Sequence, residues 1–340
     1  MKVVHVASYN YLKDGQTYYA IDYKIHNGFT RNGHMVYPFS YRDNARCGNI
    51  FGSKRFGGKK VNLRLIETCQ NIRPELLLLS HAEMITPQTL ESLRKLFPCM
   101  KIARWFVDPL WLEHHRQNIQ SKLPYVDHFF ATTDGEYLLS LVQNKDKLHF
   151  FPNTIDASID FYKNFEAPKL TIDFIFCGRD YKEPERQQFL IDLSEKLSNL
   201  QTYFFGCLGN SLIFGNDYMR VLSQSSMGLS YNRRNDVEKY CSDRIAHLTG
   251  NGILTFTPRV PGLCDLYTED EVVYFDSVEE LTDKATFFSQ HDDLRRKVAH
   301  KGWLKGHSHF ETSRVTDYME HVIFGVKSDI NIISKFIWGK

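Results

Sequence analysis

Glycine and arginine follow one predicted strand in the second half of the sequence. The strand Ile172–Cys177 runs directly into Gly178 and Arg179, and Arg186 comes in the first turns of the next predicted helix. Glycine lets the backbone approach a phosphate, and arginine can bind one through two parallel hydrogen bonds. The stretch is therefore a candidate anion site, although a turn glycine followed by a surface arginine explains the pattern equally well.

A second candidate lies in residues 241–252, which read CSDRIAHLTGNG. Ser242 or Asp243 is expected to cap a helix whose N-terminus offers free backbone N–H groups to an anion. Arg244 and His247 are three residues apart and therefore share one face of that helix. A lone histidine on a helix is more often a structural hydrogen-bonding group than a ligand contact. The neighbouring arginine and helix N-terminus shift the interpretation toward binding.

Positive charge is concentrated between residues 42 and 64, although the formal net charge of the chain is only +2. Several glycines interrupt this stretch and Asp43 is its one acidic residue, so we predict a mobile basic loop. The residues expected to bind an anionic ligand there are Lys54, Arg55, Lys59 and Lys60. A merely solvated face is the alternative. No recognition helix or zinc-finger pattern accompanies the charges, so we expect no nucleic-acid partner.

Short apolar segments alternate with amphipathic helical patterns along almost the whole chain. This alternation predicts parallel sheets covered by helices on both faces, and hence an α/β fold. Residues 157–170 carry few strong apolar patterns and are interpreted as a linker. The expected architecture is two Rossmann-like domains, 1–156 and 171–312, facing a cleft, with a C-terminal helix and tail (313–340) packing on the first. Ligands of such sheets bind beyond the carboxyl ends of the strands, where the candidate residues lie.

The composition excludes several classes of protein. Hydrophobic residues make up 42% of the chain and charged residues 24%, which is ordinary for a globular protein and not for a disordered or collagen-like one. No run of 18 apolar residues is free of charge, so no membrane span is expected. The first residues lack the pattern of a secretory signal, which favours a cytoplasmic protein. The seven cysteines include no Cys-x-x-Cys pair and are expected to be reduced thiols.

Residues 242–295 carry an ordered set of short motifs. Ser242-Asp243-Arg244, His247 and Asn251-Gly252 are followed by Pro261-Gly262-Leu263, Val273-Tyr274-Phe275-Asp276 and a closing helix at His291–Arg295. This set resembles the C-terminal domain of GT-B glycosyltransferases, specifically the family-1-like group that includes the spore-maturation CgeB-like proteins. The resemblance covers about residues 170–315 and extends more loosely into the first half. It departs from the family at His247, where many members carry a glutamate that grips the donor.

The resemblance implies a glycosyltransferase that moves a sugar from a nucleotide-diphosphate sugar to a glycan or glycolipid acceptor, such as a surface polysaccharide or lipopolysaccharide. No Asp-x-Asp motif occurs, so a metal-independent enzyme without a cofactor is expected, at most peripherally bound to the inner face of a membrane. The donor-binding residues implied are Gly178, Arg179, Arg186, Tyr231, Asn232, Ser242, Asp243, Arg244, His247, Asn251 and Gly252. The alternatives are a nucleotide-sugar epimerase on the same fold and a non-catalytic protein that binds sugar nucleotides or glycans.

Sugar transfer also needs a group that takes the acceptor's proton and positive charge beside the departing diphosphate. His81 and Glu83 follow one predicted strand, and Asp108 follows another. We predict these three as catalytic residues, with Asp108 or His81 as the proton acceptor. A helix cap before a proline explains Asp108 equally well. The pair His114-His115 is interpreted as surface residues.

Overall fold

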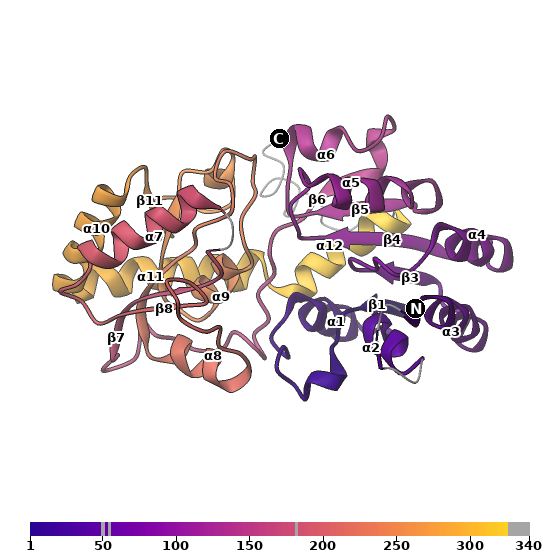
Figure 1. Ribbon diagram of the computed structural model, residues 1–340, viewed down its shortest axis with the longest axis horizontal. Helices are drawn as coiled ribbons and strands as arrows, with labels where there is room; N and C mark the ends of the chain where they lie inside the picture. Colours follow the sequence, from indigo (N-terminus) through magenta and orange to yellow (C-terminus); the bar gives the residue numbers. More distant parts are fainter. Residues whose placement is uncertain (49–51, 54–55, 181–182, 326–340) are drawn as a thin grey trace. The chain divides into compact units, whose positions relative to one another are not determined.

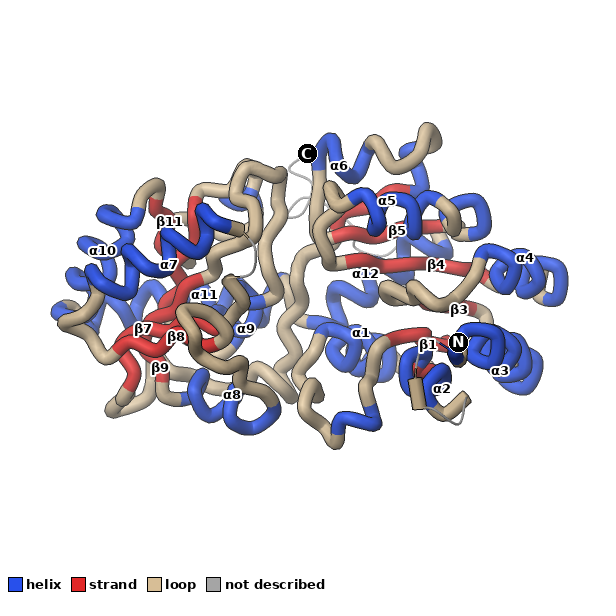
Figure 2. Tube along the Cα trace, viewed as in Figure 1, coloured by secondary structure: helices blue, strands red, loops and turns tan. Residues whose placement is uncertain are grey.

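The computed structural model describes residues 1–48, 52–53, 56–180 and 183–325, which divide into two compact units. The first unit comprises residues 1–152 and the segment that begins at Thr312, and the second comprises residues 153–311. Each unit is an α/β domain built on one parallel sheet (Figures 1 and 2). The alternation of apolar and amphipathic segments thus predicts the fold class correctly.

The sheet of the first unit has the order β2-β1-β3-β4-β5-β6, with every neighbouring pair parallel. Its strands are β1 (Lys2–Ala7), β2 (Met35–Ser40), β3 (Leu76–Leu79), β4 (Lys101–Phe106), β5 (His128–Ala131) and β6 (Leu148–Phe150). The chain leaves β1 toward β2 on one side and returns to β3 on the other. The loops after β1 and β3 therefore diverge, which is where open parallel sheets bind ligands.

Helices cover both faces of this sheet. They are α1 (Ile21–Arg31), α2 (Tyr41–Arg46), α3 (Gly58–Ile72), α4 (Pro87–Leu96), α5 (Glu113–Gln120), α6 (Gly135–Leu139) and α12 (Thr312–Phe324). On one face, Leu65 of α3 and Leu90 of α4 pack in the same apolar cluster as Leu77 and Leu79 of β3. All four residues of β3 are buried, as a strand covered on both faces requires.

The helix α12 returns from the end of the second unit to pack against α1 (Figure 1). The close approach needs a glycine, because a β-carbon on Gly28 would lie 2.6 Å from the carbonyl oxygen of Thr312. The hydroxyl of Thr312 donates to the carbonyl oxygen of Lys24 at 2.7 Å, and Asn32 Nδ2 donates to the carbonyl oxygen of Ser313 at 2.9 Å. The first unit is therefore completed by residues from the far end of the sequence.

The sheet of the second unit has the order β11-β10-β9-β7-β8, again parallel throughout. Its strands are β7 (Ile172–Cys177), β8 (Thr202–Phe205), β9 (Ser225–Leu229), β10 (Leu254–Pro258) and β11 (Val273–Phe275). Its helices are α7 (Pro184–Lys196), α8 (Gly215–Ser223), α9 (Arg244–Gly250), α10 (Val278–Gln290) and α11 (Asp292–His309). The strand order reverses between β7 and β9, which makes their carboxyl ends the switch point of this sheet.

The segment predicted as a linker, residues 157–170, belongs to the second unit. Asp160 and Asn164 are buried there. Asn164 Nδ2 donates to the carbonyl oxygens of Leu222 and Ser225, at 2.7 Å in each case. Sparse apolar residues suggested a linker, but here polar side chains satisfy buried backbone groups and so join the core. The boundary falls after Pro152.

The predicted mobile basic loop is largely helical within the described residues. Arg42 lies in α2, and α3 begins at Gly58, so that Lys59 and Lys60 are exposed in its first turn. The other two predicted anion-binding residues, Lys54 and Arg55, lie outside the described residues. Among the helices that the structure describes, none combines the length and the apolar character needed to cross a bilayer.

Candidate functional site

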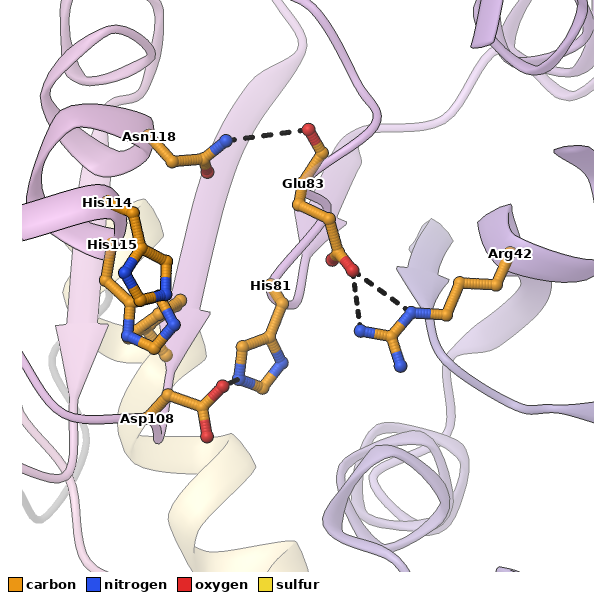
Figure 3. A pocket seen from close by; sticks show the side chains of 8 residues that line it. Arg42, His81, Glu83, Asp108, His114, His115 and Asn118 are labelled. Atoms are coloured by element: carbon orange, nitrogen blue, oxygen red, sulfur yellow. Dashed lines mark hydrogen bonds and ion pairs between the residues drawn. The ribbon is translucent and has the colours of Figure 1, made fainter. Parts of the chain in front are cut away.

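A pocket of about 320 Å³ lies at the carboxyl ends of the strands in the first unit (Figure 3). Its lining residues are Arg42, His81, Glu83, Phe106, Asp108, His114, His115 and Asn118. They come from α2, from the segment after β3, from the end of β4 and the segment after it, and from α5. The structure thus brings together the three residues predicted as catalytic, and it does so beside the switch point of the sheet.

His81 and Asp108 form the polar centre of this pocket (Figure 3). His81 Nε2 lies 3.1 Å from Asp108 Oδ2, close enough for an ion pair but not aligned as a hydrogen bond. The Asp108 side chain is 51% exposed, and that of His81 only 17%. Burial raises the pKa of Asp108, but the neighbouring imidazole of His81 outweighs it, with help from His115 and Arg42, and the net pKa is lowered. Asp108 is therefore an ionised carboxylate that solvent can reach.

Glu83 is held on both carboxylate oxygens. The Tyr41 hydroxyl donates to Oε2, and Arg42 donates to Oε1 from Nη2 at 2.6 Å and from Nε at 3.1 Å. Burial opposes ionisation of Glu83, yet the bonds from Tyr41 and Arg42 outweigh it, so its pKa is lowered. Glu83 therefore anchors Arg42 at the pocket.

The pair His114 and His115 was not predicted as part of the site, yet both line the pocket. His115 Nδ1 lies 3.0 Å from the carbonyl oxygen of Pro109, which can only accept, so Nδ1 must carry the proton. Burial lowers the pKa of His115. Their position in the sequence could have indicated this, because α5 starts just after the loop that carries Asp108.

In the second unit, Arg244 joins the ends of the two strands at the switch point. Its Nε donates to the carbonyl oxygen of Cys177 at 2.7 Å, and its Nη1 donates to that of Tyr231 at 3.1 Å. Its guanidinium carbon lies 4.7 Å from the ring centroid of Phe176. Arg244 is thus at the predicted place, but much of its hydrogen-bonding capacity binds backbone.

Arg186, from the first turn of α7, lies beside Arg244. A β-carbon on Gly178 would come within 2.5 Å of Arg244 Nη2 and 3.2 Å of Arg186 Nη2, so both guanidinium groups lie over this glycine. Gly178 therefore makes room for arginines, whereas the sequence suggested that it makes room for a phosphate. Arg186 is 6% exposed, and its Nε is buried without a hydrogen-bond partner. Burial and the charge of Arg244 lower the pKa of Arg186 to about 10, which leaves it charged at neutral pH.

Neither Arg186 nor Arg244 forms an ion pair with any carboxylate that the structure describes. Two adjacent buried cations without a counter-ion are unfavourable unless an anion joins them. The other predicted arginine, Arg179, is exposed at the surface of this unit. The arrangement favours Arg186 and Arg244 as the anion-binding pair.

Two further predicted donor residues lie near this pair. Tyr231 stacks on Phe189 of α7, with ring centroids 4.1 Å apart and planes 8° from parallel. Asn232 has a structural task, because its Oδ1 accepts from the backbone N–H of Ser242 at 2.8 Å and its Nδ2 donates to the carbonyl oxygen of Tyr240 at 3.2 Å. Asn232 thus fixes the loop that leads into α9.

His247, which was predicted to bind the donor, lies in the interior of the second unit. His247 is buried on the inner side of α9, and its Nδ1 lies 3.0 Å from Asp160 Oδ1. Asn251 and Gly252 belong to the same interior cluster. Asn251 Nδ2 donates to the carbonyl oxygen of His247 at 2.8 Å, and Gly252 adopts a φ of +68° against Phe165. These residues tie α9 to the preceding segment.

The N-terminus of α9 differs from the capped N-terminus predicted from the sequence. The helix α9 has only seven residues, and its N-cap, Asp243, makes no side-chain capping hydrogen bond. Ser242 Oγ accepts weakly from the backbone N–H of Arg244, at 3.4 Å. This short helix offers no anion site of its own, and Ser242 and Asp243 contribute to the entry of α9.

Cysteine and metal chemistry have no visible centre within the ranges described. All seven cysteines are unpaired. Within those ranges, no three side chains of His, Cys, Asp or Glu are grouped so that they could hold a metal ion.

Comparison with known proteins gives the class. Residues 174–320 match the family described as glycosyl transferase-like. Similar solved structures include sucrose-phosphate synthase from Thermosynechococcus elongatus (TM-score 0.63, 11% identity, 95% of this chain and 98% of that chain). They also include Anabaena HepE in complex with UDP and glucose (TM-score 0.56, 11% identity, 96% and 100%) and a UDP-forming trehalose-phosphate synthase from Burkholderia xenovorans (TM-score 0.56, 11% identity, 96% and 99%). No curated protein matches the sequence.

The two parallel α/β units and the similar solved structures give the GT-B fold, and residues 174–320 are glycosyl transferase-like. The matched residues span most of the second unit and the first part of α12, and the match is consistent with a family-1-like domain. The resemblance drawn from the motifs of residues 242–295 is therefore confirmed.

Proposed function

We propose that the chain transfers a sugar from a nucleotide-diphosphate sugar, held by the second unit, to a glycan or glycolipid acceptor held by the first. The observation that carries the proposal is the pair of buried guanidinium groups of Arg186 and Arg244 at the switch point of β7 and β9. A diphosphate supplies the negative charge that this pair lacks, with charge-assisted hydrogen bonds. The similarity in fold to HepE, which was solved with UDP and glucose, supports the class of donor.

In the proposed reaction, the acceptor hydroxyl gives its proton to Asp108 while its oxygen forms a bond to the anomeric carbon of the sugar. The bond between that carbon and the diphosphate oxygen breaks, and its electron pair leaves with the nucleoside diphosphate. Arg186 and Arg244 offset the developing charge. Asp108 is the proton acceptor because it is the exposed partner, and His81 positions it from the buried side.

The same two arginines support a reaction without a metal ion, because they supply the positive charge that a divalent cation supplies in other transferases. Turnover should therefore survive a chelator. Complete loss of turnover with EDTA, restored by manganese, would contradict this part of the proposal.

The acceptor proposed is an anionic surface glycan or glycolipid, such as a surface polysaccharide or lipopolysaccharide. Exposed Lys59 and Lys60 in the first turn of α3 support it, because they offer positive charge to phosphate or acidic sugars and to an anionic membrane surface.

Calorimetry with UDP, GDP and ADP tests the donor site directly. Loss of one charge-assisted bond costs roughly 1.5–3 kcal/mol, so Arg186→Met should weaken binding of the preferred nucleotide by about ten- to a hundredfold. Arg244→Met should weaken it as well. The matched control is Arg220→Met on α8, whose side chain is 64% exposed and paired with Asp217. Equal affinities in all four proteins would show that the nucleotide binds elsewhere.

A turnover assay separates transfer from its alternatives. Release of nucleoside diphosphate together with a glycosylated acceptor or free sugar is the result expected of a transferase. Interconversion of the donor sugar would indicate an epimerase, and binding without any turnover would indicate a binding protein.

A further inference from the structure

The segment His81-Ala82-Glu83, which carries two of the pocket residues, has an unfavourable backbone conformation. Ala82 is fully buried and has a φ of +44°, in the left-handed region that favours glycine. An L residue with a β-carbon keeps this conformation only when surrounding contacts maintain it. Something must therefore hold this segment in place.

Each carbonyl oxygen of the segment accepts hydrogen bonds from the side chains of Arg104, Asn118 or Lys122. Arg104 Nη2 donates to the carbonyl oxygen of His81 at 2.5 Å. Lys122 Nζ donates to the carbonyl oxygen of Ala82 at 2.8 Å. The carbonyl oxygen of Glu83 lies 3.5 Å from both Lys122 Nζ and Asn118 Nδ2 (Figure 3 shows the Asn118 contact).

Asn118 links the two basic side chains. Its Oδ1 accepts from Arg104 Nη2 at 2.9 Å and from Lys122 Nζ at 3.1 Å. Arg104 comes from β4, Asn118 from α5, and Lys122 from just after α5. Strand β4 and the region of α5 thus converge on one backbone segment.

Burial of the basic side chains of this cluster is energetically unfavourable. Arg104 is 1% exposed and Lys122 is 2% exposed, and neither is paired with a carboxylate within the described ranges. Arg104 Nε is also buried without a partner. Burial, with a further contribution from the charge of Arg104, lowers the pKa of Lys122 to about 6. Apolar side chains would fill this space at less cost, so stability alone does not explain these residues.

We propose that Arg104, Asn118 and Lys122 form a positioning cluster that holds the His81–Glu83 segment in the conformation that sets His81 against Asp108 and Glu83 against Arg42. The cluster does not act on the reacting atoms, and its part in turnover rests on the proposed function. It acts through His81, which keeps Asp108, the proton acceptor, in place. A displacement of about 1 Å at such a group can lower the rate by about a hundredfold.

The first measurement is hydrogen exchange, which needs no activity. In Lys122→Met, amides of residues 81–86 should exchange at least about tenfold faster than in the wild type. Lys122→Gln keeps an N–H donor and should fall between the two. The control is Met319→Ala on α12, a fully buried side chain outside the apolar cluster that contains Ala82. It should lower thermal stability without changing exchange in this segment.

The second measurement is kinetic. Lys122→Met should lower kcat by about ten- to a hundredfold and change KM and nucleotide affinity by less than about twofold. Adding Ala82→Gly should restore part of that kcat, because glycine adopts the left-handed conformation without the cost of a β-carbon. Met319→Ala should not lower kcat selectively while KM and nucleotide affinity stay nearly unchanged.

Unchanged exchange of residues 81–86 in Lys122→Met would overturn the proposal. So would a loss of kcat no larger than that of Met319→Ala at matched stability. Wild-type protein that transfers no sugar would instead refute the proposed function, and the exchange measurement would still decide whether the cluster holds the segment.

Discussion

Asp108 and His81 differ in how much of each side chain solvent reaches, and this difference gives them separate roles. The Asp108 carboxylate is half exposed and ionised, which suits a group that meets the acceptor. His81 is mostly buried and its Nε2 faces Asp108, which suits a group that orients the carboxylate. The sequence placed both residues after strands but left open which of them takes the proton.

Asp108→Asn should lower kcat by roughly a hundred- to ten-thousandfold, the usual contribution of a general base, and leave nucleotide affinity nearly unchanged. His81→Gln should shift the acidic limb of the pH–kcat profile to higher pH. The reason is that the imidazole lowers the pKa of Asp108, so its removal lets that pKa rise, and the base is then protonated at a higher pH.

The matched control is His128→Gln, because His128 begins β5 and so lies at the amino ends of the strands, away from the pocket at their carboxyl ends. It should leave the acidic limb in place. Full transfer rates in both Asp108→Asn and His81→Gln would show that another group accepts the proton.

Among elements, strands could be predicted from sequence better than the orientation of short helices. Apolar runs such as that of β3 place a buried strand directly, because both of its faces are covered. The spacing of Arg244 and His247 correctly puts them on one helix. It does not show that His247 faces inward, because its partner Asp160 is 87 residues away in the sequence. Arg186 was a weaker candidate for the same reason, since only the fold brings Gly178 and Phe176 to its guanidinium group.

The start of α3 was also missed, and this leads to a prediction at the scale of the element. Two glycines precede Lys59 and Lys60, and only the burial of Val61 and Leu65 shows that the helix has begun. Lysines in a first turn oppose the helix dipole, so Lys59→Gln with Lys60→Gln should leave stability unchanged or slightly raise it. If these lysines bind an anionic acceptor, the same variant should raise the acceptor KM and flatten its dependence on salt.

A salt series from about 50 to 300 mM compares this variant to a control that carries both Lys95→Gln and Lys101→Gln. The control also removes two lysines of the first unit. An identical salt profile in wild type and in the Lys59, Lys60 variant would mean that the first turn of α3 is merely solvated.

At the scale of the whole molecule, the path of the chain could be predicted only in part. Alternating patterns predict two α/β domains, but local composition does not reveal that residues 153–170 join the second unit. Their burial depends on polar contacts with strands and helices more than fifty residues away, such as those of Asn164 with Leu222 and Ser225. Similarly, only the packed structure shows that Gly28 matters to α12.

That contact carries the last prediction, Gly28→Ala. In an isolated helix alanine is more favourable than glycine by about 1 kcal/mol, so propensity alone predicts a gain in stability. In this fold the added β-carbon would lie 2.6 Å from the carbonyl oxygen of Thr312 and 2.7 Å from Thr316 Oγ1, and helix backbone cannot yield cheaply. We expect a net loss of about 1–3 kcal/mol, typical of overpacking. Gly58→Ala is the control, because its β-carbon would meet nothing within 4 Å. Denaturant unfolding measures the loss of stability. Peptide-resolved hydrogen exchange should show faster exchange in α1 and α12 and unchanged exchange in the sheet of the second unit. Equal stability of the two variants would mean that α12 is not fixed to α1 at this glycine.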